Sequence, residues 1–521
     1  MTPSWGRSLP DEVAASRPSH VHFVAIGGTG MGALAGLCKR RGFTVTGSDT
    51  QLYPPMSTKL AEWGIEVDEG FRPENVLDRD PDLVIIGNAV RAENPEAVAV
   101  LERGLPHRSF PDALFELALA DKRRIVVTGT HGKTTTTTMI ASLLHHAQRD
   151  PSFLIGGIPV EFGDSFRDGG GNDFVVEGDE YDTAFFDKTP KFLHYAPDVL
   201  VITSVEFDHA DIYRDLDHVK SVFRELVSGM APDAVIFAAT DQPGVADVVS
   251  AAPCEVQSYG VDREGAPSLA LWRGHDVEVG PHGTLFAVTP PEAVGGPFAC
   301  VVGAAGHFNA ENALVALAIA NHLGLSFEES VSASARFGGV KRRMEVRGIA
   351  RGVVIVDDFA HHPTAVRSSV AAARQRFAGR LFAVIEPRTN TSRRAIFQRD
   401  YAEAFGGADR VIVRAVDDTP IYSATGEVTE RLSADQLVSD LAARGIVAAS
   451  FGAVGDIVAA LVADVRDGDV ILVMSNGSFD GIFEKLFSAL GGDDPGALAA
   501  FIEDEQSARL LAVARAGTAR S

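Results

Sequence analysis

One stretch constrains what this chain can fold into more than any other: residues 125–138 read IVVTGTHGKTTTTT. A short β-branched run gives way to a turn bounded by glycines, and a segment typical of a helix follows. Strand, glycine turn and helix in this order predict a phosphate-binding loop, because glycines let backbone N–H groups face phosphate oxygens at a helix N-terminus. We predict that the chain binds a nucleoside triphosphate. A glycine-rich turn without a ligand is the alternative.

Two side chains of this loop predict chemistry. Lys133 would reach the β- and γ-phosphates as a point charge, and the Thr134 hydroxyl would be a ligand of Mg²⁺. The loop is shorter than the usual GxxxxGK[ST] pattern, which argues against a switch GTPase.

Length and charge limit the remaining possibilities. A chain of 521 residues is too long for one core, so about three domains are expected. A formal net charge of -23 argues against nucleic acid as a partner, because phosphate backbones need a basic surface. Three cysteines without CxxC spacing indicate neither a disulfide framework nor a zinc site. No signal pattern or bilayer-length apolar run occurs, so we expect a cytoplasmic protein without a membrane partner.

The first predicted domain begins with a βαβ unit. Residues 1–19 have no periodicity and are expected to be a loose tail. A buried-strand run at 22–26 is followed by the glycine turn 27–32, a small-residue helix, a second strand at 43–47 and Asp49. This turn would face a phosphate or pyrophosphate, and the acid lies where a ribose hydroxyl is often held. Taken alone, the unit suggests an NAD-dependent oxidoreductase.

Two strands of the second domain end in groups suited to a metal. The strand at 172–176 runs into the acidic sequence 177–182, and the strand at 199–203 runs into 204–209, which ends in His209. Ligands gather beyond the carboxyl ends of parallel strands, so these groups should meet the phosphate loop in one crevice. Such a crevice suits Mg²⁺ and a phosphoryl group. A solvated acidic turn and a structural histidine are the alternatives.

Asn309 and Asn312 open a predicted helix over residues 313–323. Their spacing places both on one helical face, where their amides can pair with the edge of a base. Capping of the helix is the alternative role.

A third domain repeats the pattern of strands that end in polar clusters. The strands at 353–356, 381–385 and 469–474 are followed by Asp-Asp-Phe-Ala-His-His, by Glu-Pro-Arg-Thr-Asn and by Ser-Asn-Gly-Ser. This predicts another doubly wound sheet whose crevice faces the ATP site. Beyond about residue 490, a helix is predicted over 497–514.

The fold class is therefore α/β with three domains. We predict a tail at 1–19, a Rossmann-like domain at 20–118, a central P-loop ATPase-type domain at 119–335, a Rossmann-like C-terminal domain at 336–490 and an extension at 491–521. The family resemblance given next implies that the domain at 20–118 binds a UDP-sugar.

Six motifs in fixed order resemble one family. GTHGKTTTT, EGDEYD, EFDHADIY, GHFNAEN, the run 341–345 and DDFAHHPT follow the order of the Mur ligases, and the resemblance covers residues 21–490. It implies an ATP-dependent, amide-forming enzyme of peptidoglycan metabolism. Residues 27–32, 386–391 and 474–477 resemble the recycling branch, which joins UDP-N-acetylmuramate to L-alanyl-γ-D-glutamyl-meso-diaminopimelate. The runner-up is the UDP-N-acetylmuramate:L-alanine ligase.

The resemblance also implies roles for individual residues. The catalytic residues would be Lys133, Glu177 and His209, and the metal ligands Thr134, Glu177 and His209. ATP would be bound by Gly129, Thr130, His131, Gly132, Lys133, Thr134, Thr135, Asn309, Asn312, Arg343 and Asp358, the last at the ribose. The UDP-sugar would be bound by Gly28, Thr29, Gly30, Met31, Gly32, Asp49 and His131. The peptide would be bound by His361, Arg388, Asn390, Ser475 and Asn476. ATP and Mg²⁺ are the implied cofactors, and closure of the third domain should complete the site.

Four residues depart from the family pattern. Ser204 replaces an asparagine, Gly178 an alanine and Val356 a tyrosine, and Phe223 falls where some members carry a carbamoylated lysine. The first three changes remove no charge and no phosphate-binding group. With Phe223 at the fourth position, no lysine carbamate is expected.

Two other functional classes stay open at this stage. An NAD-dependent oxidoreductase would leave the phosphate loop, Glu177 and His209 unexplained, whereas a non-catalytic nucleotide-binding module would be expected to lose one of them. The partners expected are small molecules, and the sequence is compatible with a monomer or a homodimer.

Overall fold

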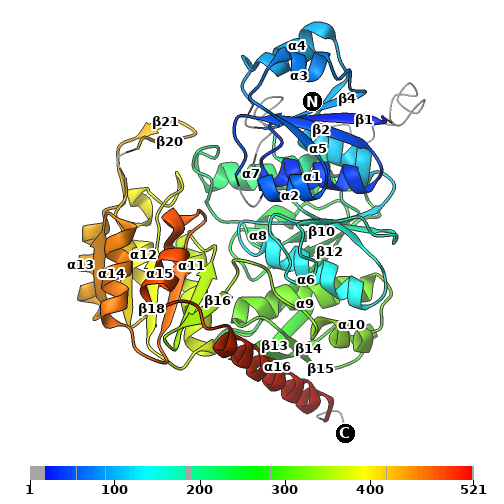
Figure 1. The fold of residues 1–521 in the computed structure, drawn as a ribbon. Coiled ribbons are helices and arrows are strands. Elements are labelled where there is room, and N and C mark those ends of the chain that lie inside the picture. The colour runs from blue at the N-terminus through cyan, green and yellow to red at the C-terminus, as the bar shows by residue number, and fades with distance from the viewer. Residues whose placement is uncertain are drawn as a thin grey trace.

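The computed structural model describes residues 18–53, 56–88, 90–181, 189–281, 283–417 and 419–518. Nearly all of the predicted tail at 1–19 lies outside these residues. Three large sheets follow one another along the chain, at the top, in the middle and at the left of Figure 1. The α/β class and the three-domain architecture are confirmed.

The N-terminal domain is a parallel sheet with helices on it. Its elements are β1 (His20–Val24), α1 (Thr29–Arg40), β2 (Thr44–Asp49), α2 (Met56–Glu62), β3 (Glu66–Glu69), α3 (Pro73–Leu77), β4 (Leu83–Ile86), α4 (Pro95–Arg103), β5 (His107–Ser109) and α5 (Phe110–Leu114). The strand order is β3-β2-β1-β4-β5, and every pair is parallel. This arrangement is Rossmann-like, as predicted, and it leaves the glycine turn between β1 and α1 at the carboxyl edge.

The central domain is built on a larger mixed sheet. Its strands are β6 (Arg123–Thr128), β7 (Ser152–Leu154), β8 (Phe166–Arg167), β9 (Asp173–Glu177), β10 (Val199–Ile202), β11 (Val235–Ala238), β12 (Glu255–Val261), β13 (Trp272–Gly280), β14 (Gly283–Thr289) and β15 (Phe298–Val302). Its helices are α6 (Lys133–His146), α7 (Leu216–Ser228), α8 (Val245–Val249), α9 (His307–His322) and α10 (Phe327–Ser334). The strand order is β15-β14-β13-β12-β11-β10-β6-β9-β7-β8.

Register in this sheet positions the site. β6 lies between β9 and β10, all parallel, with Val127 opposite Glu177 and Thr128 opposite Ile202. The phosphate loop, the acidic run and the segment leading to His209 therefore leave the same edge of the sheet side by side.

The threonine-rich helix α6 is buried rather than amphipathic. Thr136, Thr137 and Thr138 are fully buried. Thr137 and Thr138 donate their hydroxyls to the carbonyls of Lys133 and Thr134, one turn earlier. These bonds satisfy polar groups that would otherwise be costly inside the core.

The third domain is again a mostly parallel sheet. Its strands are β16 (Glu345–Ala350), β17 (Val353–Asp358), β18 (Leu381–Ile385), β19 (Arg410–Arg414), β20 (Ile421–Ser423), β21 (Gly426–Val428), β22 (Val447–Phe451) and β23 (Val470–Met474). Its helices are α11 (Pro363–Arg376), α12 (Gln398–Ala404), α13 (Ala434–Ala443), α14 (Val454–Asp464) and α15 (Ile482–Ala489). The main order is β16-β17-β23-β18-β19-β22, with only β16 antiparallel, and β20 and β21 form a separate hairpin.

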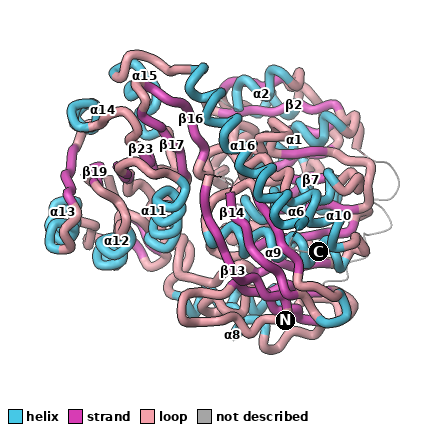
Figure 2. Tube along the Cα trace, turned by 90° about the horizontal axis from the view of Figure 1, so that it is seen from below, coloured by secondary structure: helices cyan, strands magenta, loops and turns pink. Residues whose placement is uncertain are grey.

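The C-terminal helix α16 (Pro495–Thr518) is longer than predicted and crosses between two domains. It runs diagonally below the molecule in Figure 1, and in Figure 2 it lies between β16 and the helices of the central domain. It packs on β15 and β14 of the central domain and on β16 of the third. No described helix is long and apolar enough to cross a bilayer.

Candidate active site

The phosphate loop has the backbone geometry that its glycines allow. Gly129 has φ of +129° and Gly132 has φ of +82°, values that L side chains rarely adopt. A Cβ atom on Gly129 would also lie 2.1 Å from Oγ1 of Thr203. The loop is braced by the segment after β10, because the Ser204 hydroxyl accepts the N–H of His131 at 2.9 Å. Ser204 thus holds the loop in place despite its departure from the family pattern.

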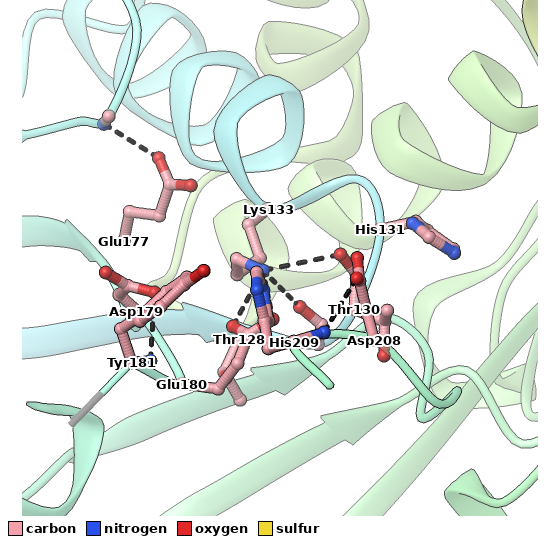
Figure 3. A network of polar contacts seen from close by, with 12 residues as sticks. Thr128, Thr130, His131, Lys133, Glu177, Asp179, Glu180, Tyr181, Asp208 and His209 are labelled. Atoms are coloured by element: carbon pink, nitrogen blue, oxygen red, sulfur yellow. Dashed lines mark hydrogen bonds and ion pairs between the residues drawn. The ribbon is translucent and has the colours of Figure 1, made fainter. Parts of the chain in front are cut away.

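Lys133, Glu180 and His209 form the polar centre of the site (Figure 3). Lys133 Nζ donates to Glu180 Oε1 at 3.0 Å, and His209 Nε2 lies 3.0 Å from the same oxygen. Burial alone would raise the pKa of Glu180, but Lys133 and His209 hold this pKa below its usual value. Burial opposes the charge of His209, yet Glu180 raises the His209 pKa to about 9. The predicted residues Lys133 and His209 therefore form a charged network through the neighbouring acid Glu180.

Thr134 and Glu177 form a second group beside this network. Thr134 Oγ1 donates to Glu177 Oε1 at 2.9 Å, and Glu177 Oε2 accepts the N–H of Gly156 at 2.8 Å. Burial raises the pKa of Glu177, although Lys133 opposes this shift. A hydroxyl and a carboxylate oxygen are hard ligands of the kind that Mg²⁺ prefers, so this pair fits the predicted ion.

The third domain reaches into this second group. Arg343 Nη2 donates to Thr134 Oγ1 at 3.2 Å. The predicted ATP residue Arg343 is thus brought to the phosphate loop across the domain boundary.

The two asparagines lie behind the phosphate loop. α9 begins at His307, earlier than predicted, so Asn309 and Asn312 are within the helix and both are buried. Asn312 Oδ1 accepts the hydroxyl of Thr136 at 3.0 Å, and Asn312 Nδ2 donates to Asn309 Oδ1 at 3.2 Å. Their pairing with a base stays a prediction. Thr135, another residue expected at ATP, is buried in the first turn of α6.

Asp358 is occupied within its own domain. It accepts the N–H groups of Met344 and Ala360 and the hydroxyl of Ser369, at 2.8–2.9 Å. In this conformation the Asp358 carboxylate stabilises the backbone at the end of β17. Its contact with a ribose stays a prediction.

A cavity of about 680 Å³ opens at the carboxyl edge of the N-terminal sheet. Four residues predicted to bind the UDP-sugar line it: Gly28, Gly30, Met31 and Asp49. The lining also includes residues that the sequence did not indicate, among them Phe71, Asn88, Arg91 and Lys191. Asp49 Oδ2 also accepts the N–H of Gly27 at 2.8 Å, which holds the glycine turn.

The other two glycine-turn residues are not in this lining. Thr29 is exposed at the start of α1, and Gly32 is buried where a Cβ would lie 2.2 Å from Met56 Sδ. Lys191 comes from the central domain and pairs with Asp179 at 2.6 Å, a contribution that only the packing of two domains reveals.

The predicted peptide residues lie at the ends of adjacent strands in the third domain. Met474 of β23 is opposite both Asp358 of β17 and Ile385 of β18, so the segments after these strands share one edge. Arg388 is exposed and packs on Gly477, where a Cβ would lie 2.1 Å from Nη1. Its guanidinium has no hydrogen-bond or carboxylate partner among the described residues.

The remaining peptide candidates differ in what they offer. Ser475 is buried and donates its hydroxyl to Glu386, and the buried Oδ1 of Asn476 has no partner among the described residues. Asn390 Oδ1 accepts the N–H of Tyr422 at 3.4 Å. His361 Nδ1 lies 3.0 Å from the carbonyl of Phe359.

The other departures from the family pattern are structural. Phe223 is buried on α7 with its ring 5.3 Å from that of Phe192. A Cβ on Gly178 would lie 2.9 Å from Val126 Cγ1, so the site is tight, and Val356 is fully buried in β17.

Comparisons with known proteins find Mur ligases along most of the chain. Residues 20–122 match the Mur ligase family catalytic domain, residues 127–320 the Mur ligase middle domain and residues 342–477 the Mur ligase glutamate ligase domain. The chain is 38% identical over 475 residues to a UDP-N-acetylmuramate–L-alanyl-γ-D-glutamyl-meso-2,6-diaminoheptandioate ligase of Haemophilus influenzae, covering 90% of this chain and 99% of the relative.

Two further similarities are informative. A UDP-N-acetylmuramate–L-alanine ligase of Saccharopolyspora erythraea is also 38% identical, over 468 residues that cover 88% of this chain and 90% of the relative. The crystal structure of a murein peptide ligase from Psychrobacter arcticus superposes with a TM-score of 0.67 at 32% identity, covering 91% of this chain and 99% of that one.

Proposed function

Since this chain belongs to the Mur ligase family, an ATP-dependent group of amide-forming ligases, we propose that it joins UDP-N-acetylmuramate to L-alanyl-γ-D-glutamyl-meso-diaminopimelate. The proposed reaction recycles murein peptide in the cytoplasm, where nucleotide substrates are available. The observation that carries the chemistry is the meeting of Lys133, Glu177 and His209 with Arg343 of the third domain at one phosphate loop.

The proposed reaction has two steps. A carboxylate oxygen of UDP-N-acetylmuramate attacks the γ-phosphorus of ATP, and ADP leaves, so that an acyl phosphate forms. The α-amine of the tripeptide then attacks the acyl carbon, and the resulting tetrahedral intermediate expels phosphate and loses a proton. Activation is needed because a carboxylate oxygen is otherwise a very poor leaving group.

The chain's own cations stabilise the transferring group in this proposal. The ammonium group of Lys133 contacts the carboxylate of Glu180 in this structure. When ATP binds, a phosphoryl oxygen would take the place of that carboxylate. Charge stabilisation and positioning are the main contributions that a protein makes to phosphoryl transfer. Thr134 and Glu177 would hold one Mg²⁺, which would neutralise phosphate charge. His209 would hold a second as neutral imidazole, after giving up the proton that its contact with Glu180 stabilises.

The amine substrate is assigned to the third domain. Arg388 lies against Gly477, and its guanidinium has no hydrogen-bond partner among the described residues. Thr391 of the same loop accepts the N–H of Ala210 at 3.1 Å, so this loop contacts the central domain. A planar guanidinium suits bidentate recognition of a peptide carboxylate.

The L-alanine ligase is the second candidate, because a relative with that activity has the same identity to this chain as the tripeptide ligase does. One assay separates the two. Phosphate release is measured with ATP, Mg²⁺ and UDP-N-acetylmuramate plus either tripeptide or L-alanine, and the product is identified by mass. We expect tripeptide to be preferred. Preference for L-alanine would assign the second activity, and release without either amine would contradict both.

A further inference from the structure

Three side chains from different parts of the chain converge next to the phosphate loop. His131 belongs to the loop, Glu206 follows β10, and His362 precedes α11 of the third domain. One nitrogen or oxygen atom from each lies within 4.8 Å of the others, and His131 Nε2 is 3.7 Å from Glu206 Oε2. The rings of His131 and His362 are 4.8 Å apart.

Two imidazole nitrogens in this group are unused. Nε2 of His131 and Nε2 of His362 are buried without a hydrogen-bond partner among the described residues. His362 itself is 6% exposed. Buried polar atoms are rarely left unpaired, so two of them around one carboxylate indicate a ligand.

Charge favours a cation as that ligand. Glu206 Oε2 accepts the hydroxyl of Thr364 at 2.8 Å, and a second acid, the buried Asp208, lies two residues further along the same segment. Neutral imidazole and carboxylate are metal ligands, whereas an anion would meet two negative charges.

We propose that His131, Glu206 and His362 bind a divalent transition-metal ion such as Zn²⁺, which fastens the third domain to the phosphate loop. Two histidines and one carboxylate with an open fourth position are a typical zinc set. Mg²⁺ prefers oxygen ligands, so this site is distinct in chemistry from the Thr134–Glu177 pair. It does not depend on the amine substrate assigned above.

The geometry requires a small adjustment. Ligand atoms around a tetrahedral Zn²⁺ are about 3.3 Å apart, so the cluster must contract by about 1.5 Å at its widest pair. His362 Nδ1 accepts a long bond from Thr364 N at 3.3 Å. If Nε2 of His362 binds the metal, the ring proton moves to Nδ1, which can then no longer accept the N–H of Thr364. The new metal–nitrogen bond replaces this weak hydrogen bond. Thr364 also donates to Glu206 Oε2 at 2.8 Å, which orients the carboxylate.

The test is titration of the full chain with Co²⁺ in the absence of nucleotide, followed by visible absorption. We expect one equivalent to bind with the spectrum of a four-coordinate nitrogen–oxygen site, to be displaced by Zn²⁺ and to resist millimolar Mg²⁺. His131→Ala, Glu206→Gln and His362→Ala should each weaken binding about tenfold or more. Zn²⁺ should also raise the unfolding temperature of the wild type, because only the folded chain assembles the site.

His146→Ala is the matched control, since His146 pairs with Glu161 at 2.8 Å on the far end of α6 and should leave Co²⁺ affinity unchanged. Glu206→Gln keeps the shape of the side chain, so a folded Glu206→Gln protein with wild-type affinity would overturn the proposal. So would the absence of saturable binding. Loss of Co²⁺ in Glu177→Gln but not in His362→Ala would place the ion at the Mg²⁺ group and equally refute the site.

Discussion

Lys133 and Glu180 form a buried ion pair at the centre of the active site, with Nζ 3.0 Å from Oε1 and Glu180 only 3% exposed. A phosphoryl oxygen that reaches the loop lysine must compete with this carboxylate. The pair keeps the lysine charged and positioned, because Glu180 raises the Lys133 pKa against the effect of burial. His209 shares the same carboxylate and would retain Glu180 when the lysine turns to a phosphate.

Lys133→Ala should abolish turnover while the chain stays folded. The substitution removes the cation that offsets charge on the transferring group, and we expect a loss of about 10³-fold or more in phosphate release. Circular dichroism would verify folding. Phosphate release close to that of the wild type in a folded variant would contradict the assignment of the phosphate loop.

Glu177→Ala and His209→Ala should change the dependence on Mg²⁺ more than the affinity for ATP. Each variant removes one predicted ligand, so a higher Mg²⁺ concentration should partly restore the less damaged of the two. The measurement is initial rate against Mg²⁺ at saturating ATP. Asp179→Ala is a matched control, because Asp179 pairs with Lys191 rather than with Thr134. If both variants keep the Mg²⁺ dependence of the wild type, the two-metal hypothesis is wrong.

Arg388→Lys tests the peptide site. Lysine keeps the charge but loses the planar fork, so kcat/KM for the tripeptide should fall about tenfold or more with little change in the KM for ATP. Arg399→Lys is the control, since Arg399 is an exposed arginine of the same domain that pairs with Glu403. If the kinetics with the tripeptide were unchanged, a residue other than Arg388 would have to bind the peptide carboxylate.

Glu311→Gln should flatten the pH dependence of central-domain stability. Burial raises the Glu311 pKa to about 7, although Arg263 and Gln242 oppose the shift. The folded protein therefore binds the proton more tightly than the unfolded chain, and stability falls as pH rises from about 4.5 to about 7. At pH 8 the variant should be about 1–3 kcal/mol more stable than the wild type, and at pH 4.5 the difference should vanish.

Denaturant unfolding at the two pH values measures this difference. Gln242 donates to Glu311 Oε2 at 2.7 Å, and glutamine at position 311 can still accept that bond. Glu503→Gln, at an exposed position of α16, provides the comparison. An equal stability difference at both pH values would show that Glu311 does not titrate in this range.

Arg509→Ala should weaken the packing of α16 against the central domain. Arg509 donates at 3.2 Å to the carbonyls of Gly303 and of Phe337, a residue that packs in the core of the central domain although it follows residue 335. Glu505 pairs with Arg376 of the third domain at 2.7 and 2.8 Å. Loss of two bonds from a part-buried guanidinium should cost about 2–3 kcal/mol of local stability. Hydrogen exchange over residues 495–513 should quicken in this variant. The exposed neighbour Leu510 gives the control Leu510→Ala, and equal exchange in both variants would contradict the docking role.

Much of this protein follows from local sequence. The phosphate loop, the Rossmann-like glycine turn and the polar ends of β9, β10, β17, β18 and β23 were all predictable, because strand, turn and helix preferences act over a few neighbouring residues. The rule that ligands gather at the carboxyl ends of parallel strands then places these groups at common edges. The family resemblance added the activity and the roles of individual residues, and the comparisons confirm the family.

Contacts between domains were decided only by the tertiary structure. Arg343 meets Thr134, His362 meets His131, and Lys191 enters the cavity of the N-terminal domain, although each pair or site joins residues far apart in the chain. Periodicity and motifs carry no information on such distances, because they depend on how three separately folded sheets pack together. Packing within each domain decides which acids find partners inside the protein, as Glu180 does with Lys133 and Asp358 with the N–H of Met344. It also leaves the Arg388 guanidinium without a hydrogen-bond partner among the described residues.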